Sequence, residues 1–305
     1  MKKIIKITAI VLAALLVLLM VLANVIYYIV IKSDSSKDVV FGFEQNQIDV
    51  PEIDDKDKVE VEFTDEEITS YDGLKLHGCS IEQNPDVWVI GIHGYTDNGK
   101  VVGQLCGGYY FAGMSILLPD LRGQGKSEGE YIAFGWEDRL DIISWIDYLN
   151  KKYDNPSIIL YGVSMGASCA LMASGEELPD NVKCIISDSA YTSIKDEFEY
   201  EAKTLLHLPY YPVVWTASMV TKVRAGYSFE EGDALAQVKK SSTPTLFIHG
   251  TKDTFVPETN MLKLYDACSA PKAKYEGIGS EHCMSQLDNY DEYWQKVLEF
   301  IGEYI

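Results

Sequence analysis

The fold is decided by the stretch Ser157-Ile158-Ile159-Leu160-Tyr161-Gly162-Val163-Ser164-Met165-Gly166. Its first five residues are apolar enough for a strand buried on both faces. The next five have the form G-x-S-x-G, in which a tight strand-to-helix turn projects the serine and the glycines let strand and helix approach closely. The pattern predicts Ser164 as a nucleophile. The alternative is a structural glycine turn that carries an idle serine.

Strand-like and helix-like stretches alternate on both sides of this turn, which predicts an α/β fold. Short apolar runs indicate strands that are buried on both faces; they cover Val87–Ile92 and residues 115–118, 183–187 and 245–248. Longer stretches between them are compatible with helices, at residues 99–112, 136–153, 166–176 and 258–267. This alternation predicts a mostly parallel central sheet with helices on both faces.

An antiparallel hairpin is predicted at the start of the sheet. Residues 59–63 alternate apolar and charged side chains, which is the period of a half-exposed strand. Asp72-Gly73 is a turn signal between strand-like residues 67–71 and 74–81. In a sheet of this kind ligands bind beyond the carboxyl ends of the parallel strands, so the chemistry is expected just after each strand.

A nucleophilic serine needs a base and an orienting acid. In hydrolases that carry such an elbow, the acid and then the histidine follow the serine along the chain. Asp253 comes shortly after residues 245–248, in His249-Gly250-Thr251-Lys252-Asp253, and is the predicted acid. It has an alternative interpretation as a turn residue that caps the next helix. Asp188, after residues 183–187, is the second candidate acid.

The chain has five histidines, and only His282 lies downstream of Asp253. It therefore occupies the one position that the chain order requires. We expect its Nδ1–H to be held by Asp253 while its Nε2 takes the proton of Ser164. Preorganised N–H donors must stabilise the oxyanion; we assign them to the amides of Met165, directly after the nucleophile, and of Tyr95, in the loop after Val87–Ile92.

Together these motifs resemble the α/β-hydrolase superfamily over residues 59–305. They occur in the family's order: His93-Gly94-Tyr95, Asp120-Leu121-Arg122-Gly123-Gln124-Gly125-Lys126-Ser127, the elbow at Ser164, the acid loop and His282. The chain looks most like the monoacylglycerol-lipase and serine-aminopeptidase-like branch, especially its bacterial members with an N-terminal membrane anchor. The resemblance implies esterase, lipase or peptidase activity without a cofactor. One departure is that Glu281 and Cys283 flank the histidine, where family members often have Gly or Ala.

Residues 191–237 lie between two predicted core strands and are too many for a simple crossover. In the superfamily such an insertion resembles a cap over the active site. Its apolar side chains either line a site for an acyl chain or aromatic ester, or pack the cap onto the body. They are Phe198, Tyr200, Leu205, Leu206, Leu208, Tyr210, Tyr211, Trp215 and Phe229.

Residues 1–31 are predicted to be a transmembrane anchor. The almost unbroken apolar run over residues 7–31 can cross a hydrocarbon core of about 30 Å at 1.5 Å per residue. A signal peptide has a shorter apolar region, and the weak cleavage candidate at residues 22–24 is followed by further apolar residues. Tyr27 and Tyr28 suit the far membrane interface.

The charges around this run predict its orientation. Lys2, Lys3 and Lys6 precede it, whereas Lys32 after it is offset by Asp34. The positive-inside rule then places the N-terminus in the cytoplasm and the catalytic body outside the cell membrane. Residues 32–58 are polar and acidic and are expected to be a linker to the hydrolase domain at residues 59–305.

Composition excludes other classes of function. The formal net charge of −20 repels phosphate backbones, so no nucleic-acid partner is expected. Six cysteines without a C-x-x-C pair make a structural zinc site improbable, so no metal is expected. Cys169 and Cys184 fall in apolar segments and are expected to be buried free thiols. The oligomeric state is not readable from the sequence.

The leading hypothesis is therefore an esterase that acts on small-molecule or lipid-derived acyl esters. A peptidase or amidase is the alternative, because the same three residues serve both reactions. Glu197, Glu199 and Glu201 would then supply an anionic site for a substrate ammonium group. A third hypothesis is a catalytically silent binding protein on a hydrolase scaffold, although such proteins usually lose one of the three residues.

Overall fold

The central feature of the molecule is a sheet of eight strands in the order β1-β2-β4-β3-β5-β6-β7-β8. The structure is a computed structural model, and it describes residues 1–35, 62–205 and 207–305. The strands are β1 (Thr64–Thr69), β2 (Lys75–Ile81), β3 (Val87–Ile92), β4 (Ser115–Pro119), β5 (Ser157–Val163), β6 (Val182–Asp188), β7 (Thr245–Gly250) and β8 (Lys272–Gly277). β2 is antiparallel to both β1 and β4, and every other pair is parallel. The predicted mostly parallel sheet, entered by an antiparallel hairpin, is confirmed.

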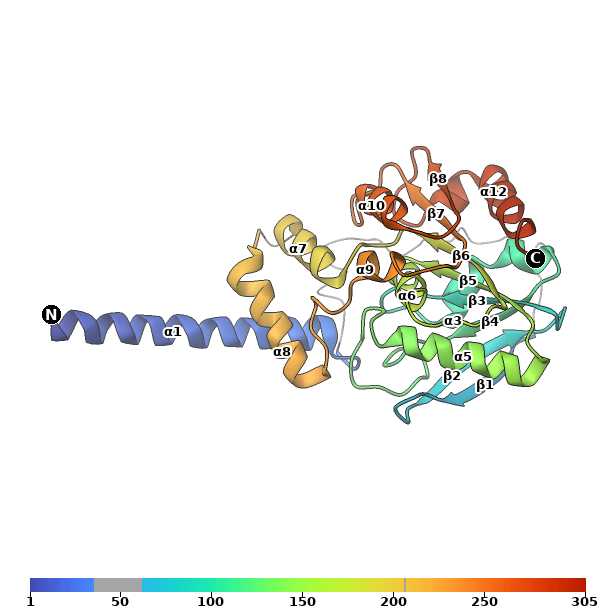
Figure 1. The fold of residues 1–305 in the computed structure, drawn as a ribbon. Helices are drawn as coiled ribbons and strands as arrows, with labels where there is room; N and C mark the ends of the chain where they lie inside the picture. Colours follow the sequence, from blue (N-terminus) through green and yellow to red (C-terminus); the bar gives the residue numbers. More distant parts are fainter. Residues whose placement is uncertain (36–61, 206) are drawn as a thin grey trace.

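Helices cover both faces of this sheet (Figure 1). In the body they are α3 (Gly99–Gln104), α4 (Gly107–Phe111), α5 (Asp138–Tyr153), α6 (Met165–Ala173), α9 (Ala234–Val238), α10 (Thr259–Ala267), α11 (Ser285–Asp288) and α12 (Tyr290–Gly302). Between β6 and α9 lie α7 (Ile194–Leu205), a π-helical turn η2 (Tyr210–Val214) and α8 (Trp215–Ala225). The predicted helix over residues 99–112 is interrupted, because two short helices, α3 and α4, share that stretch.

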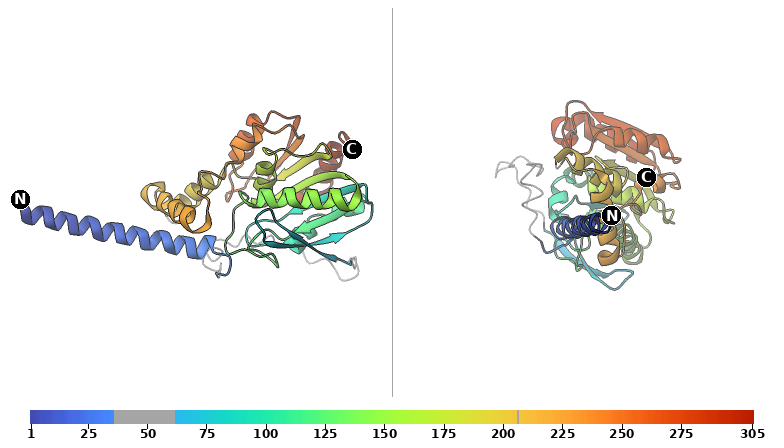
Figure 2. Two further views of the ribbon diagram at one scale, coloured as in Figure 1. Left: turned by 60° about the horizontal axis from the view of Figure 1, so that its bottom comes forward. Right: turned by 90° about the vertical axis from the view of Figure 1, so that its left-hand side faces the viewer.

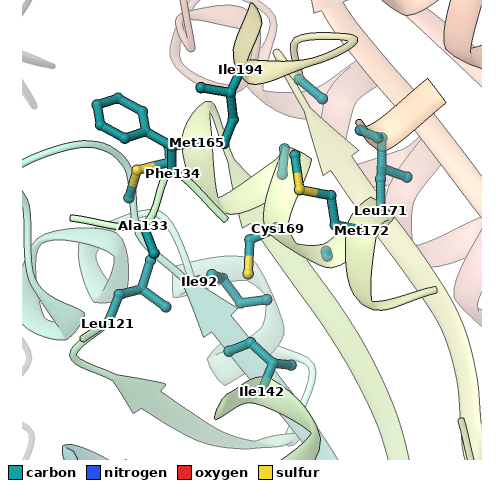
Figure 3. Close-up of a cluster of buried hydrophobic side chains, with 14 of the residues drawn as sticks. Ile92, Leu121, Ala133, Phe134, Ile142, Met165, Cys169, Leu171, Met172 and Ile194 are labelled. Carbon is teal, nitrogen blue, oxygen red and sulfur yellow. The ribbon is translucent and has the colours of Figure 1, made fainter. Parts of the chain in front are cut away.

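Successive residues of the buried strands point into two separate cores. Along β3, Trp88 and Ile90 join the core under α5 and α6, whereas Val89 joins the core under α3, α4 and α12. The first core includes Ile142 of α5 and Cys169 of α6 (Figure 3). Apolar residues therefore predominate along these strands, since both faces of the sheet are buried there.

The hairpin at the sheet edge differs from its prediction in where it begins. Its strands turn at Gly73, which has a φ of +95°, a conformation that glycine adopts readily. Glu67 pairs with His77, as the predicted turn requires, but β1 begins at Thr64. Glu62 and Phe63 are not in a strand, and the pairing of β1 with β2 ends at Thr64 and Ser80. The remaining residues of the predicted strand at 59–63, numbers 59–61, lie outside the described residues.

The N-terminal apolar run forms α1 (Lys2–Ile26), which continues as a π-helical turn, η1 (Tyr27–Ile31). It is long and apolar enough to cross a membrane. Most of it extends away from the body as a rod, and its C-terminal end lies against α8 and the body (Figures 1 and 2). Of the predicted linker at residues 32–58, Ser33 bonds to the backbone of Glu130, and residues 36–58 lie outside the described residues.

Candidate active site

Ser164 sits at the turn between β5 and α6, as the G-x-S-x-G pattern predicts. Its backbone has φ 53° and ψ −120°, a strained conformation for a residue with a side chain. The two glycines allow the close approach that the turn needs. A Cβ on Gly162 would lie 2.3 Å from the carbonyl oxygen of Gly166, and a Cβ on Gly166 would lie 2.1 Å from that of Ile92. The turn holds the Ser164 hydroxyl at the carboxyl end of the central strand.

His282 and Asp253 reach this hydroxyl from the loops after β8 and β7. The Nε2 of His282 lies 2.9 Å from the Oγ of Ser164, and its Nδ1 lies 2.6 Å from the Oδ2 of Asp253. The side chain of Asp253 is fully buried and that of His282 is 10% exposed. An imidazole held between a hydroxyl and a carboxylate can take up the proton of the hydroxyl while the carboxylate stabilises the resulting cation. The structure thus brings the three predicted side chains together.

The carboxylate of Asp253 is held by more than His282. Its Oδ1 accepts hydrogen bonds from the amides of Phe255, at 3.0 Å, and Val256, at 2.8 Å. Burial alone would raise its pKa, but the hydrogen bonds from His249 and His282 outweigh burial and lower the pKa to about 2. Asp253 is therefore ionised throughout the neutral range, which is the charge state that the predicted orienting acid requires.

His249 is a contributor that sequence reasoning missed. Its Nε2 lies 2.7 Å from the carbonyl oxygen of Val256 and 3.2 Å from the Oδ2 of Asp253, and its side chain is fully buried. Burial opposes protonation, but the contact with Asp253 raises the pKa of His249. Its position four residues before the acid was visible in the sequence, but nothing there indicated that the two side chains meet.

Asp188, the second candidate acid, is turned toward other partners. Its Oδ1 accepts a hydrogen bond of 3.0 Å from the hydroxyl of Ser189, and its Oδ2 accepts one of 3.0 Å from that of Tyr293. Its backbone carbonyl accepts a 2.8 Å bond from the amide of Ser164. Asp188 therefore supports the elbow through its main chain, while the His282 imidazole is oriented by Asp253.

The loop after β3, which carries Tyr95, lies against the elbow. A Cβ on Gly94 would lie 3.8 Å from the Cβ of Ser164. Met165 is the first residue of α6, and the first amides of a helix have no acceptor within the helix. The amides of Met165 and Tyr95 thus belong to two segments that border the Ser164 side chain, which is where oxyanion donors are needed.

A neighbouring loop, residues 120–127, fixes the loop that carries Tyr95. The Oε1 of Gln124 accepts a 2.7 Å hydrogen bond from the amide of Thr96, and the Nε2 of His93 accepts one of 2.9 Å from the amide of Leu121. Burial lowers the pKa of His93 to about 4, so the imidazole is neutral and can accept this bond. These contacts hold the loop's backbone without using a charged group beside the serine.

Aromatic side chains connect the segment between β6 and β7 to the site. The ring of Phe198, on α7, packs edge-on against Phe134, with 5.1 Å between centroids, and Phe134 stacks on Tyr95 at the same separation. Tyr200, also on α7, donates a 2.8 Å hydrogen bond to the carbonyl of Thr254, the residue after the acid. The insertion thus contacts the Asp253 loop directly and reaches the Tyr95 loop through Phe134.

The cysteines and the acidic side chains are the other groups that could carry chemistry. All six cysteines are buried free thiols, as predicted for Cys169 and Cys184. Within residues 1–35, 62–205 and 207–305, no group of three His, Cys, Asp or Glu side chains is placed to hold a metal ion.

Known proteins resemble the chain in both sequence and fold. The family described as "Serine aminopeptidase, S33" matches residues 83–232. The uncharacterised protein YqkD of Bacillus subtilis is 29% identical over 99% of this chain and 97% of that protein. The membrane protein YNL320W of Saccharomyces cerevisiae is 27% identical over 63% of this chain and 62% of that protein.

A solved structure repeats the architecture. The esterase Pf2001 of Pyrococcus furiosus superposes with a TM-score of 0.67 at 24% identity, over 84% of this chain and 97% of that one. The eight-stranded sheet, the serine elbow between β5 and α6, the matching family and this shared architecture agree. The chain therefore has the α/β-hydrolase fold, and over residues 83–232 it is similar in sequence to the serine aminopeptidase family.

Proposed function

We propose that the protein is a serine hydrolase that cleaves carboxylic esters, with Ser164 as nucleophile, His282 as general base and Asp253 as orienting acid. The observation that carries the proposal is the pair of distances at His282, 2.9 Å to the Ser164 hydroxyl and 2.6 Å to the Asp253 carboxylate. The similarity to the serine aminopeptidase family over residues 83–232 and the fold shared with the Pyrococcus furiosus esterase support the same reaction class.

The reaction follows from this geometry. His282 Nε2 takes the hydroxyl proton as Ser164 Oγ attacks the ester carbonyl, which gives a tetrahedral oxyanion. The carbon–oxygen bond to the alcohol then breaks, and the imidazolium returns the proton to the leaving alcohol. Water, deprotonated by the same imidazole, attacks the acyl-serine and releases the carboxylic acid and free Ser164. Asp253 holds the imidazole in the required tautomer throughout.

The oxyanion is assigned to the backbone amides of Met165 and Tyr95. Each donor in such a pair typically contributes about 3 kcal/mol to transition-state stabilisation. The Met165 amide is also the first of helix α6, whose dipole favours negative charge at that end. Backbone donors cannot be removed by a side-chain substitution, so the position of the Tyr95 loop becomes the testable variable.

The substrate class is argued from the insertion and the anchor. We propose that residues 191–237 form a cap, because α7 contacts the Asp253 loop directly and the Tyr95 loop through the ring of Phe134. The aromatic side chains that link this cap to the site favour acyl or aromatic esters over highly charged substrates. The N-terminal helix would hold the site near esters dissolved in a membrane, so lipid-derived acyl esters are the preferred class.

The location of the protein is proposed from its N-terminal helix. Residues 1–31 are assigned as a single-pass anchor in the cell membrane, with Lys2, Lys3 and Lys6 on the cytoplasmic side and the catalytic body outside. One relative, YNL320W of yeast, is also called a membrane protein.

Full-length protein in detergent provides the test. A fluorophosphonate should label the wild type and Ser144→Ala but not Ser164→Ala; both variants lose one hydroxyl, and Ser144 lies on α5 with its hydroxyl bonded to the carbonyl of Leu140. The wild type should hydrolyse p-nitrophenyl esters, with a loss of about 10⁴-fold or more in Ser164→Ala. Equal hydrolysis by the two variants would reject the assignment of Ser164.

The same preparation separates an esterase from a peptidase. Aminoacyl and dipeptidyl amides should be assayed beside the esters, with acyl chains of increasing length. We expect the esters to have the higher kcat/KM. A preference for amides with a free amino terminus would instead support the peptidase alternative, and would direct attention to Glu197, Glu199 and Glu201 on α7.

A further inference from the structure

Helix α8 lies beside the C-terminal end of the N-terminal helix α1. It contacts α1 and crosses it near its C-terminal end (Figure 1). Ala23, on the last turns of α1, is fully buried, whereas Val21 and Val25 beside it are exposed. The guanidinium of Arg224, on α8, lies 5.2 Å from the ring centroid of Tyr27. The last turns of α1 and the helix α8 therefore lie at the same level along the axis of α1.

The outward side of η2 and α8 carries large apolar side chains that the body leaves exposed. Tyr211 is 68% exposed, Trp215 is 41% exposed and Val223 is 87% exposed. The rings of Tyr211 and Trp215 lie 6.4 Å apart, and the half-buried Met219 falls between Trp215 and Val223 at the spacing of one helix side. A contiguous apolar stripe of this kind marks an interaction surface. We call these four residues the outer stripe.

The charge of this segment is unlike that of the rest of the chain. Residues 202–229 contain no Asp or Glu, although the chain carries 46 acidic residues in 305. The same segment contains three basic residues, Lys203, Lys222 and Arg224. Lys222 is paired with Glu231 at 2.8 Å, and Lys203 and Arg224 are exposed. In a chain with a net charge of −20, this is a region that an anionic surface does not repel.

We infer that η2 and α8 form a second membrane contact, which lies in the interface of the bilayer that α1 spans. Trp and Tyr rings favour the headgroup level, and an amphipathic helix lies there with its apolar side in the acyl boundary and its basic residues near the phosphates. The outer stripe enters the lipid, and Lys203 and Arg224 face the headgroups. This inference rests on the proposed anchoring by α1.

The observations favour a lipid bilayer as the partner that covers the outer stripe. The stripe belongs to the helix that packs on α1, so a membrane spanned by α1 must come close to it. Protein partners would not require that proximity, and the absence of acidic residues from residues 202–229 fits anionic lipid headgroups. A consequence is that the proposed cap is held at the bilayer surface, so that esters can pass from lipid to Ser164 without crossing bulk water.

Quenching by brominated lipids tests the contact in the full chain. Val223→Cys is labelled with bimane and reconstituted into phosphatidylcholine liposomes with and without a minority of phosphatidylglycerol. Ile305→Cys is the matched control, because Ile305 is 49% exposed and the C-terminus lies at the end of the body far from α1 (Figure 1). All six native cysteines are buried, so the added thiol is the one that reacts.

Brominated lipid should reduce the emission of the label at residue 223 by about twofold or more, and leave the label at residue 305 unchanged. The reduction should be larger with phosphatidylglycerol, and Arg224→Gln should remove part of that increase. Flotation of the liposomes reports anchoring separately. Protein that floats, with equal quenching at residues 223 and 305, would overturn this inference alone. Protein that does not float would overturn the proposed anchoring together with it.

Discussion

The hydroxyl of Tyr95 donates a hydrogen bond of 2.8 Å to the carbonyl oxygen of Val30. Val30 lies in η1, where the N-terminal helix enters the body, and Tyr95 lies in the loop assigned to the oxyanion. The amide of Ile132 adds a second contact, a 2.8 Å bond to the carbonyl of Ile31. The end of the proposed membrane anchor is therefore part of the wall that supports the candidate active site, and the two are mechanically connected.

Replacing Tyr95 by Phe should lower kcat of the full-length protein several-fold while KM for a short ester changes little. The substitution keeps the ring that stacks on Phe134 but removes the bond to Val30, so the loop loses one of its fixed points. Losing one such hydrogen bond should cost about 1 kcal/mol in the free energy of unfolding. Steady-state kinetics and urea unfolding in the same detergent measure both effects.

Tyr227→Phe is the matched control for that prediction. Tyr227 is also buried and also donates to a backbone carbonyl, that of Ile132 at 2.7 Å, but it belongs to the segment after α8. It should lose similar stability and keep its kcat. If both variants lose stability equally and neither loses activity, the Tyr95–Val30 bond has a purely structural role.

The two candidate acids can be separated by one substitution each. Asp253→Asn should reduce kcat by about 10⁴-fold, because an Asn amide donates to Nδ1 of His282 and selects the wrong tautomer. Asp188→Asn should keep kcat within about threefold, since the Asp188 side chain contacts Ser189 and Tyr293 and its link to Ser164 is through the backbone. Ester hydrolysis measures both; equal losses would contradict the assignment of Asp253.

The strands were predictable because their signals are local. Buried parallel strands require continuous apolar runs. The strand that the sequence predicts at residues 87–92 therefore has the same bounds in the structure, Val87–Ile92. The serine turn is equally local, since two glycines and the following helix determine its geometry. The chain order then indicates which loops must meet, and the structure brings Ser164, His282 and Asp253 within hydrogen-bond distance.

Sequence reasoning missed contacts that no local pattern of residues encodes. Nothing near Tyr95 indicates that its hydroxyl reaches Val30, which lies 65 positions earlier in the chain. The contact between His249 and Asp253 depends on how a buried loop folds, and apolar periodicity carries no information about it. The predicted helix at residues 99–112 was interrupted because two short segments pack separately, although the whole stretch is compatible with a helix.

Asp97, in the loop beside Ser164, should make the protein less stable as the pH rises. Burial raises its pKa from 3.8 to about 6. The unfolded chain therefore releases this proton first, so the contribution of Asp97 to the free energy of unfolding falls between about pH 4 and pH 6 and stays lower above that range. The effect should be about 1–3 kcal/mol. Asp97→Asn should accordingly be more stable than the wild type at pH 8 and similar to it at pH 4.

Urea unfolding of the full-length protein at these two pH values measures the difference. Asp86→Asn is the control, because Asp86 is an exposed aspartate on the surface loop before β3. It should leave the stability unchanged at both values. If Asp97→Asn raises the free energy of unfolding equally at pH 4 and pH 8, packing is responsible and not the charge of the Asp97 carboxylate.

Gly166→Ala should destabilise the protein far more than Gly107→Ala, another Gly-to-Ala change in a helix. A Cβ there would lie 2.1 Å from the carbonyl oxygen of Ile92 and 2.6 Å from that of His93, and both are backbone atoms that can yield only if α6 moves away from β3. Forced overpacking of this kind costs about 2–3 kcal/mol. Because the elbow must move as well, the Ser164 hydroxyl should also leave the reach of His282, and fluorophosphonate labelling should fall.

Gly107→Ala, where a Cβ meets nothing within 4 Å, should leave both stability and labelling unchanged. Wild-type labelling in Gly166→Ala would mean that helix and strand can separate without moving the nucleophile, and the glycine would then serve packing alone.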